Sequence, residues 1–263
     1  MGLTSHDIPL TLKHALLLCD TKLNLNVFSR YYIKKHQNSK CICPVVYGEF
    51  KCLMYLPNIM DWIQIRIFRQ NTFYEHQIIP FFAEYINTSS IIADIGANIG
   101  NHSIVFSKLL QAKKVYAFEP VAETFNVLKV NIELNALSET VTVENLAIGA
   151  KKNFGSIISS PPNNAGGTEI NYNEDGELII ITLDDYFIFD EKELPNVLKI
   201  DVEGFELEVL KGGYQTITIV KPTIFIEIWK SNYEEVNSYL ERIKYKQHLK
   251  IGDDFYIYLP VQP

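Results

Sequence analysis

Acidic residues stand at the ends of three apolar runs in this 263-residue chain, where they could meet a bound ligand. Asp94 ends the first run and opens the segment Asp94-Ile95-Gly96-Ala97-Asn98-Ile99-Gly100. Glu119 ends the second run, and Asp201 ends the third, with Glu203 close behind it. Ionised carboxylates accept hydrogen bonds from hydroxyl groups, attract positive charge and can take up a proton. We therefore expect the residues that bind a ligand or transfer a proton to lie at the ends of these three runs.

The segment from Asp94 to Gly100 predicts a cofactor-binding loop between a buried strand and a helix. Gly96 and Gly100 allow a positive φ and a close approach of the backbone to a ligand. The helix that follows presents free N–H groups at its start. We expect cofactor contacts from Asp94, Gly96, Ala97, Asn98, Gly100 and Asn101. The alternative is a plain strand-to-helix turn without a ligand.

Asp94 and the glycine spacing indicate which cofactor this loop would bind. The dinucleotide fingerprint needs Gly-x-Gly-x-x-Gly, whereas this chain has Gly-Ala-Asn-Ile-Gly. A carboxylate at the end of the first strand would repel a pyrophosphate and would attract the amino-bearing methionine end of S-adenosylmethionine (SAM). The loop therefore favours SAM.

The next two strand ends predict contacts with the nucleoside part of the cofactor. Glu119 lies about 25 residues after Asp94, near the spacing at which an acid meets a ribose in doubly wound folds. Asn145, or the backbone around Ala147, follows the third strand and could meet the edge of an adenine ring. The alternatives are that Glu119 caps the following helix and that the third strand simply ends.

The acceptor side of the site is predicted from Asp201, Glu203 and His102. The two acids follow a core strand, at the edge where open α/β sheets bind ligands. A methyl transfer to an alcohol needs alignment and a base, and each of the three residues is a candidate for the base. His102 is expected in the first turn of the helix that follows the loop, where the helix dipole would keep it neutral. The alternatives are a helix-capping acid pair and a structural histidine.

Strands and helices alternate from residue 90 onward, which predicts a parallel sheet covered by helices on both faces. We expect strands at 91–94, 114–118, 141–145, 178–183, 197–202 and 223–228, followed by an antiparallel pair at 248–251 and 255–259. Helices are expected at 103–110, 121–135, 205–211 and 233–243, the third of them stopped by Gly212-Gly213. Residues 153–176 are expected to form loops and a hairpin near the active face.

Residues 1–88 are interpreted as an N-terminal extension of helix and strand that could form a lid or an oligomer contact, and residues 89–263 as the cofactor-binding domain. Within the extension, 47–56 and 62–68 are predicted as two strands because they are rich in β-branched and aromatic residues. A short helix is predicted at 73–85, with a break or kink at Pro80.

Composition narrows the class of protein further. The net charge is -7 and no basic stripe is visible, which disfavours a nucleic-acid partner. The four cysteines include Cys41-Ile42-Cys43, which is not a zinc-binding spacing, and no ligand cluster calls for a metal. No apolar run is long enough to be a signal peptide or to span a membrane. We expect a soluble cytoplasmic protein of unknown oligomeric state.

Taken together, the motifs resemble the FkbM family of methyltransferases. The resemblance covers about Phe73 to Trp229 and rests on Tyr74-Glu75 and on the segments 94–102, 118–120, 182–185 and 200–206. It implies a class I Rossmann-like SAM-dependent methyltransferase, with a seven-stranded, mostly parallel sheet whose last strand is antiparallel. It also implies O-methylation, commonly of a sugar or polyketide hydroxyl. The resemblance further suggests that Glu75 and residues 164–168 lie near the cofactor or substrate.

The leading hypothesis is therefore a SAM-dependent O-methyltransferase that acts on a hydroxyl of a sugar or glycan-type small molecule. One alternative is a nucleotide-dependent oxidoreductase, which Asp94 and the glycine spacing disfavour. Another is a non-catalytic SAM-binding protein, which would bind the cofactor without turnover.

Overall fold

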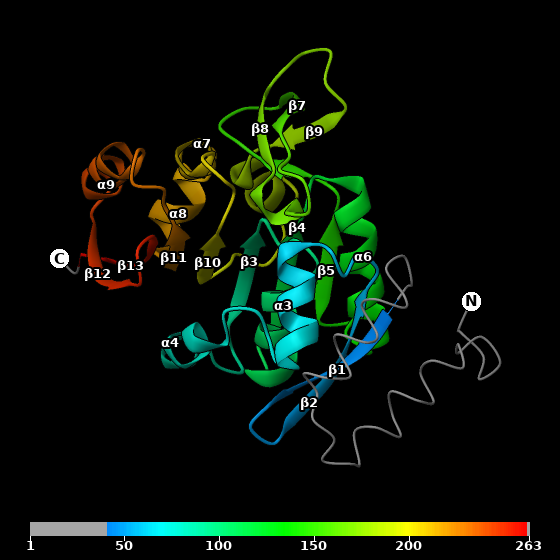
Figure 1. Cartoon of the computed structure of the whole chain (residues 1–263). Coiled ribbons are helices and arrows are strands. Elements are labelled where there is room, and N and C mark those ends of the chain that lie inside the picture. The colour runs from blue at the N-terminus through cyan, green and yellow to red at the C-terminus, as the bar shows by residue number, and fades with distance from the viewer. Residues whose placement is uncertain (1–40, 262–263) are drawn as a thin grey trace.

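Seven strands form the central sheet of the structure, a computed structural model that describes residues 41–261 (Figure 1). The strands run in the order β12-β13-β11-β10-β3-β4-β5. β13 pairs antiparallel with both β11 and β12, and the other pairings in this sheet are parallel. The predicted mostly parallel sheet with an antiparallel last strand is confirmed. Its strands are β3 (Ile91–Ile95), β4 (Lys114–Phe118), β5 (Val141–Glu144), β10 (Val197–Ile200), β11 (Thr223–Glu227), β12 (Tyr245–Ile251) and β13 (Phe255–Pro260).

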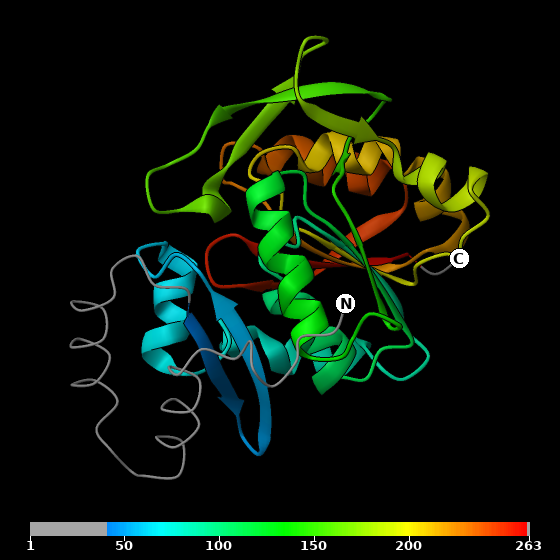
Figure 2. The same ribbon diagram turned by 90° about the vertical axis from the view of Figure 1, so that its right-hand side faces the viewer.

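Both faces of this sheet are buried because successive side chains of each strand point to opposite sides. In β3, Ile92 packs into the core on one face and Ala93 into the core on the other. The first face is covered by α4 (Ile79–Tyr85), α5 (Asn101–Ile104) with the π-helical turn Val105–Leu109, and α6 (Ala122–Leu134). The second face is covered by α7 (Glu206–Gly212), α8 (Tyr214–Val220), α9 (Tyr233–Arg242) and the π-helical turn Asp185–Phe189 (Figure 2).

The strand order places a topological switch point between β3 and β10. From β3 the chain proceeds to β4 and β5 on one side, and later strands occupy the other side. Loops that leave neighbouring strands at such a point diverge to opposite faces and open a crevice at the carboxyl ends of the strands. The loops after β3, β4, β10 and β11 are therefore positioned to build a site.

The inserted segment forms a second, smaller sheet above the carboxyl ends of the central strands (Figure 1). It consists of β6 (Ala147–Ile148), β7 (Asn153–Ser159), β8 (Glu169–Tyr172) and β9 (Leu178–Ile181), in the order β6-β9-β7-β8. The predicted hairpin in 153–176 is present as β7 and β8. The strand predicted at 178–183 exists as β9, but it belongs to this second sheet.

The N-terminal part of the described chain differs from the prediction in two ways. The segment 47–56 is not one strand, because a turn with Gly48 at φ +59° separates β1 (Cys41–Tyr47) from β2 (Phe50–Leu56). The segment 62–68 is not a strand but lies in α3 (Trp62–Gln70). The Asp61 side chain caps this helix by accepting hydrogen bonds from the N–H groups of Ile63 and Gln64.

One further helix prediction needs correction, and another is confirmed but followed by a helix that the sequence analysis did not predict. The break expected at Pro80 is a helix start, since Pro80 occupies the first turn of α4 just after the 3₁₀ turn His76–Ile78. The helix expected to stop at Gly212-Gly213 does end at Gly212, but α8 begins at once at Tyr214. The predicted features of residues 1–40 lie outside the described residues.

The β1–β2 hairpin is held to α6 by two asparagine side chains that bind the backbone of β2. The Asn131 amide accepts a hydrogen bond from the N–H of Tyr55 and donates to its carbonyl oxygen. Asn135 makes the same pair of bonds with Leu53. Asn131 also donates to the Ile99 carbonyl oxygen in the cofactor loop at 2.8 Å. The hairpin and the loop are thereby joined through one helix.

Replacement of Asn131 by alanine is expected to lower the free energy of unfolding by about 1–3 kcal/mol, because backbone groups of Tyr55 and Ile99 lose their partner in a buried place. Urea unfolding would measure the change. Asn126→Ala, an exposed asparagine on the same helix, is the matched control and is expected to change stability by less than about 0.5 kcal/mol. Equal effects of the two substitutions would contradict the bridging role of Asn131.

Candidate cofactor and acceptor site

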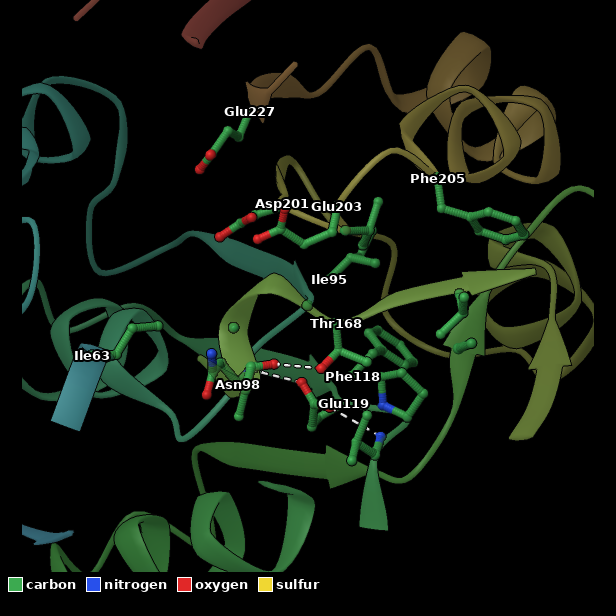
Figure 3. Close-up of a pocket in the computed structure, with 18 of the residues that line it drawn as sticks. Ile63, Ile95, Asn98, Phe118, Glu119, Thr168, Asp201, Glu203, Phe205 and Glu227 are labelled. Carbon is green, nitrogen blue, oxygen red and sulfur yellow. Dashed lines mark hydrogen bonds between the residues drawn. The ribbon is translucent and has the colours of Figure 1, made fainter. Parts of the chain in front are cut away.

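A pocket opens at the carboxyl ends of β3, β4, β10 and β11 (Figure 3). It encloses about 970 Å³ of empty space, part of it open to solvent. Of the residues predicted for the site, the pocket wall includes Gly96, Asn98, Glu119, Ala147, Asp201 and Glu203. Asp94, Ala97, Gly100, Asn101, His102 and Asn145 are not part of the wall. The predicted residues thus fall into a group that faces the pocket and a group that lies behind it.

The loop from Gly96 to Gly100 is held between the ends of β4 and β10. The N–H groups of Gly96 and Ala97 donate to the Phe118 carbonyl oxygen at 3.0 and 2.9 Å. Gly96 has φ +78°, and a Cβ built on it would lie 1.8 Å from the backbone oxygen of Asp201. A Cβ on Gly100, at φ +88°, would lie 2.8 Å from Leu128 Cδ1. The positive φ favours glycine at both positions, and at Gly96 the backbone of Asp201 also leaves no space for a Cβ.

Asp94 lies beneath the loop rather than on the pocket wall, with its side chain fully buried. Its Oδ2 accepts a hydrogen bond from Ser103 Oγ in α5, and its Oδ1 has no hydrogen-bond partner. Burial raises the pKa of this carboxyl, and the nearby Lys199 ammonium opposes the rise. Asp94 therefore contacts the helix and the lysine that support the loop, and its side chain is not among those that line the pocket.

Lys199 is a central residue of the site that the sequence reasoning missed. It is on β10 and only 2% exposed. Its Nζ donates to the Gly96 carbonyl oxygen at 3.0 Å and to Asp201 Oδ2 at 3.1 Å, and it lies 3.5 Å from Asp94 Oδ1. Burial alone would lower its pKa, but the two carboxylates outweigh burial and raise it. The ammonium therefore ties the loop after β3 to the loop after β10.

Glu119 lines the pocket and also organises the backbone around it. Its Oε2 accepts from the Asn98 N–H at 3.0 Å, and its Oε1 accepts from the Val121 N–H at 2.9 Å at the start of α6. Each oxygen keeps a second lone pair for a ligand hydroxyl. Burial raises its pKa to about 7. Helix capping and a ligand role are thus compatible for this side chain.

The wall beside Glu119 is apolar. It is formed by Phe118, Leu146, Ala147 and Ile148. Asn145 does not face the pocket, because its amide donates to the carbonyl oxygens of Glu119 and Pro120, both at 2.9 Å. Asn145 therefore orients the turn that carries Glu119, while the apolar residues offer a surface for a flat ring.

Four carboxylates gather on the opposite wall, and we call them the acidic wall: Glu75, Asp201, Glu203 and Glu227. Figure 3 shows Asp201, Glu203 and Glu227 together, across the pocket from Asn98 and Glu119. Burial, with the charge of Asp201 as the next cause, raises the pKa values of Glu75 and Glu203 to about 7. The charge of Asp201, followed by burial, raises the pKa of Glu227 well above its usual range. Glu227 was not singled out from the sequence, although it ends an apolar strand as Asp94 and Glu119 end theirs, and this signal could have found it.

His102 does not reach the pocket. Its ring is 6% exposed and lies edge-on to Phe82, with the ring centroids 5.4 Å apart. Its Nε2 has no hydrogen-bond partner and lies 3.8 Å from Glu75 Oε2. Burial lowers its pKa well below the usual value, so the ring is neutral at pH 7. The geometry places His102 behind Glu75 and not beside an acceptor.

Two segments that are distant in the sequence meet over the mouth of the pocket, namely the start of α3 and the stretch 163–168. The Trp62 N–H donates to the Asn163 carbonyl oxygen at 2.6 Å, and the Ala165 N–H donates to Asp61 Oδ2 at 2.9 Å. Ile63, Asn164 and Thr168 line the pocket from these segments. Glu75 and residues 164–168, which the family resemblance had suggested, are therefore at the site.

The residues of the pocket suit SAM on chemical grounds. Carboxylates on the acidic wall complement positive charge, Glu119 has free lone pairs for ribose hydroxyls, and the wall from Phe118 to Ile148 suits an adenine ring. Within the described residues, no three His, Cys, Asp or Glu side chains are grouped as metal ligands.

Comparison with known proteins gives one family match and related methyltransferases. The Methyltransferase FkbM domain matches residues 94–249. Hexuronic acid methyltransferase AglP from Haloferax volcanii is 35% identical over 141 residues, which are 52% of this chain and 56% of AglP. Methyltransferase sdnD from Sordaria araneosa is 29% identical over 178 residues, which are 54% of this chain and 68% of sdnD.

A solved structure, Methyltransferase FkbM from Methylobacillus flagellatus KT, is 19% identical with a TM-score of 0.49. The match covers 66% of this chain and 44% of that one. The chain thus spans only about half the length of AglP and less than half of the solved FkbM chain. In the part of the chain that the structure describes, no helix is both long and apolar enough to cross a lipid bilayer.

Proposed function

Because the chain belongs to the FkbM methyltransferase family and uses SAM as its cofactor, we propose that it methylates a hydroxyl oxygen of a sugar or glycan-type small molecule. The observation that carries the proposal is the acidic wall opposite Glu119, with glutamates that can exchange protons near neutral pH. The name of AglP, a hexuronic acid methyltransferase, supports a sugar as the acceptor.

When bound, SAM supplies a methyl carbon on a positively charged sulfur that an oxygen nucleophile can attack. Glu119 and the apolar wall bind the nucleoside. The loop from Gly96 to Asn98 holds Glu119 in place through the hydrogen bond from the Asn98 N–H. Glu203 or Glu75 accepts the proton that the acceptor hydroxyl loses as its oxygen gains the methyl group. Asp201, fixed by Lys199, accepts a hydrogen bond from the acceptor and orients it.

The residues at the mouth of the pocket also fit a sugar. The Trp62 ring lines the pocket and is half exposed. The Arg66 guanidinium lies 3.7 Å from the centre of the Trp62 ring and fixes its orientation. Aromatic faces pack on the apolar C–H faces of sugar rings, while carboxylates accept bonds from sugar hydroxyls. We further propose that nucleic acid is not the acceptor, since the pocket wall carries acids that would repel phosphates.

A methyl-transfer assay with radiolabelled SAM tests this function. The acceptors are methyl glycosides of common hexoses, and the matched control is the same glycoside with every hydroxyl already methylated. We expect label to enter the free glycosides and not the control. Transfer to an amine or a phosphate-bearing acceptor, with no sugar labelled, would contradict the proposal.

The cofactor half of the site is tested separately with Glu119→Ala. We expect this substitution to weaken SAM binding at least about tenfold, because a hydrogen bond to a charged group contributes about 1.5–3 kcal/mol. Calorimetric titration would measure the affinity. Unchanged affinity would remove Glu119 from the cofactor site without affecting the choice of acceptor.

A further inference from the structure

The described lining of the pocket is rich in acids, and Lys199 behind it balances only part of their charge. The acidic wall and Glu119 place five acids on the lining, and no lining residue in the described part of the chain is Lys or Arg. Lys199 lies behind the wall, where it is already bound to Asp201, Asp94 and the Gly96 carbonyl oxygen. A bound ligand therefore meets carboxylates whose charge is only partly balanced.

We propose that the acidic wall discriminates between the cofactor and its product by charge, so that SAM binds more tightly than S-adenosylhomocysteine (SAH). The two molecules differ by one methyl group and by the positive charge on sulfur, which is lost on transfer. Carboxylates that attract this charge stabilise bound SAM, and they contribute less to the binding of SAH, which lacks the charge. The inference rests on the cofactor of the family and is independent of the acceptor.

The position of the acidic wall makes its charge effective. Asp201 and Glu203 follow β10, Glu227 ends β11, and Glu75 precedes the 3₁₀ turn before α4, so four acids from three parts of the chain converge on one pocket. The side chains of Glu75 and Asp201 are only 27% and 28% exposed. Water and salt screen such groups less than they screen surface charges. The acids therefore act together on whatever occupies the pocket.

The same arrangement links binding of a cation to release of protons. Burial and the charge of Asp201 raise the pKa values of Glu75 and Glu203 to about 7 in the free protein. A positive charge in the pocket lowers these pKa values, so protons leave as the cation binds. The charged and titratable groups that face these glutamates, or lie beside them, are Asp201, Lys199, Tyr74, Asp254, Glu227, Glu206, Glu169 and His102.

The direction of the pH effect follows from the pKa values of the free protein. Well below pH 7 the carboxyls of Glu75 and Glu203 are mostly protonated, and a cation must displace those protons before it can bind to carboxylates. Affinity for SAM therefore rises as Glu75 and Glu203 ionise toward pH 7, and it continues to rise above pH 7 as Glu227 ionises, since the charge of Asp201 and burial raise the pKa of Glu227 to about 9. SAH carries no charge on its sulfur, so its affinity depends less on pH.

Calorimetric titration of the full-length protein with SAM and SAH at pH 5.5 and pH 7.0 tests the inference. The α-amino groups of both ligands stay protonated in this range, since such groups titrate at about pH 8. We expect SAM affinity to rise about tenfold, the effect of one pKa unit, and SAH affinity to rise less than about threefold. Sinefungin, which carries an amine in place of the methylsulfonium, is expected to follow SAM.

Glu75→Gln is the diagnostic variant because it removes a charge and keeps the shape of the side chain. We expect it to reduce the preference for SAM over SAH about fivefold or more while SAH binding stays within about twofold, which also shows that the variant is folded. Glu133→Gln, an exposed glutamate on α6, is the control and should match the wild type. Equal pH dependence for SAM and SAH, or tighter binding of SAH at every pH, would overturn the inference. Failure of all three ligands to bind would instead refute the cofactor assignment on which both proposals depend.

Discussion

Gly96→Ala is expected to lower the free energy of unfolding by at least about 4 kcal/mol or to prevent folding altogether. The new Cβ would lie 1.8 Å from the Asp201 backbone oxygen, and the contact is with backbone that cannot move away as a side chain could. The φ of +78° adds strain of about 1 kcal/mol for a residue with a Cβ. Urea unfolding of the purified variant would measure the loss, and SAM titration would show whether any folded protein retains the loop.

Gly48→Ala distinguishes the two causes of destabilisation, which are the steric contact of the new Cβ and the backbone strain at a positive φ. Gly48 also has a positive φ, +59°, but nothing lies within 4 Å of its Cβ position. This substitution is expected to cost only the backbone strain of about 1–2 kcal/mol. If Gly96→Ala were no more destabilising than Gly48→Ala, the loops after β3 and β10 would not be in the close contact described above.

Lys199→Met is expected to destabilise the protein by about 3–5 kcal/mol, because two carboxylates lose the cation that they share in a buried place. The Gly96 carbonyl oxygen loses its hydrogen bond as well. Methionine has a similar length and is apolar, so loss of packing contributes little. Urea unfolding at pH 7 would measure the change.

The double variant Lys199→Met, Asp94→Asn tests the electrostatic origin of that loss. Removing the charge of the fully buried Asp94 should restore at least about half of the stability, since one unpaired buried charge is gone. Lys113→Met is the surface control. Its ion pair with Glu193 joins two side chains that are each 54% exposed, and we expect less than about 1 kcal/mol. A double variant as unstable as Lys199→Met alone would contradict the pairing of charges.

The central sheet could be predicted from the sequence because its strands are short apolar runs that end in acids or turn residues. Ile91–Ile95 and Lys114–Phe118 are such runs, and the chain alternates between them and helices. The segment Trp62–Gln70 was misread because isoleucine, tryptophan and phenylalanine favour strands. In the structure, the Asp61 cap and the i, i+4 spacing of Ile63 and Ile67 form a helix instead.

The candidate site was predictable only along the segments that carry recognisable motifs. Gly96, Asn98, Glu119, Asp201 and Glu203 line the pocket where the motifs placed them, and their roles in binding and transfer stay predictions. Glu227 ends an apolar strand as the predicted acids do, but no recognisable motif surrounds it, and Lys199 is a single charged residue inside an apolar strand. Their importance depends on neighbours from other strands, and a sequence does not show which strands are adjacent.

The bonds from α6 to β2 have a consequence for how this chain can diverge. In β2, Asn131 and Asn135 form hydrogen bonds with the N–H and C=O groups of Tyr55 and Leu53, so these bonds do not depend on the side chains at positions 53 and 55. As far as these bonds are concerned, positions 53 and 55 accept any residue except proline, which lacks the N–H group. Substitution of Asn131 or Asn135, in contrast, removes hydrogen bonds that hold the hairpin to α6. Variation of the hairpin is limited on its inner side, because Val45, Met54 and Leu56 are fully buried in the core that α6 also joins.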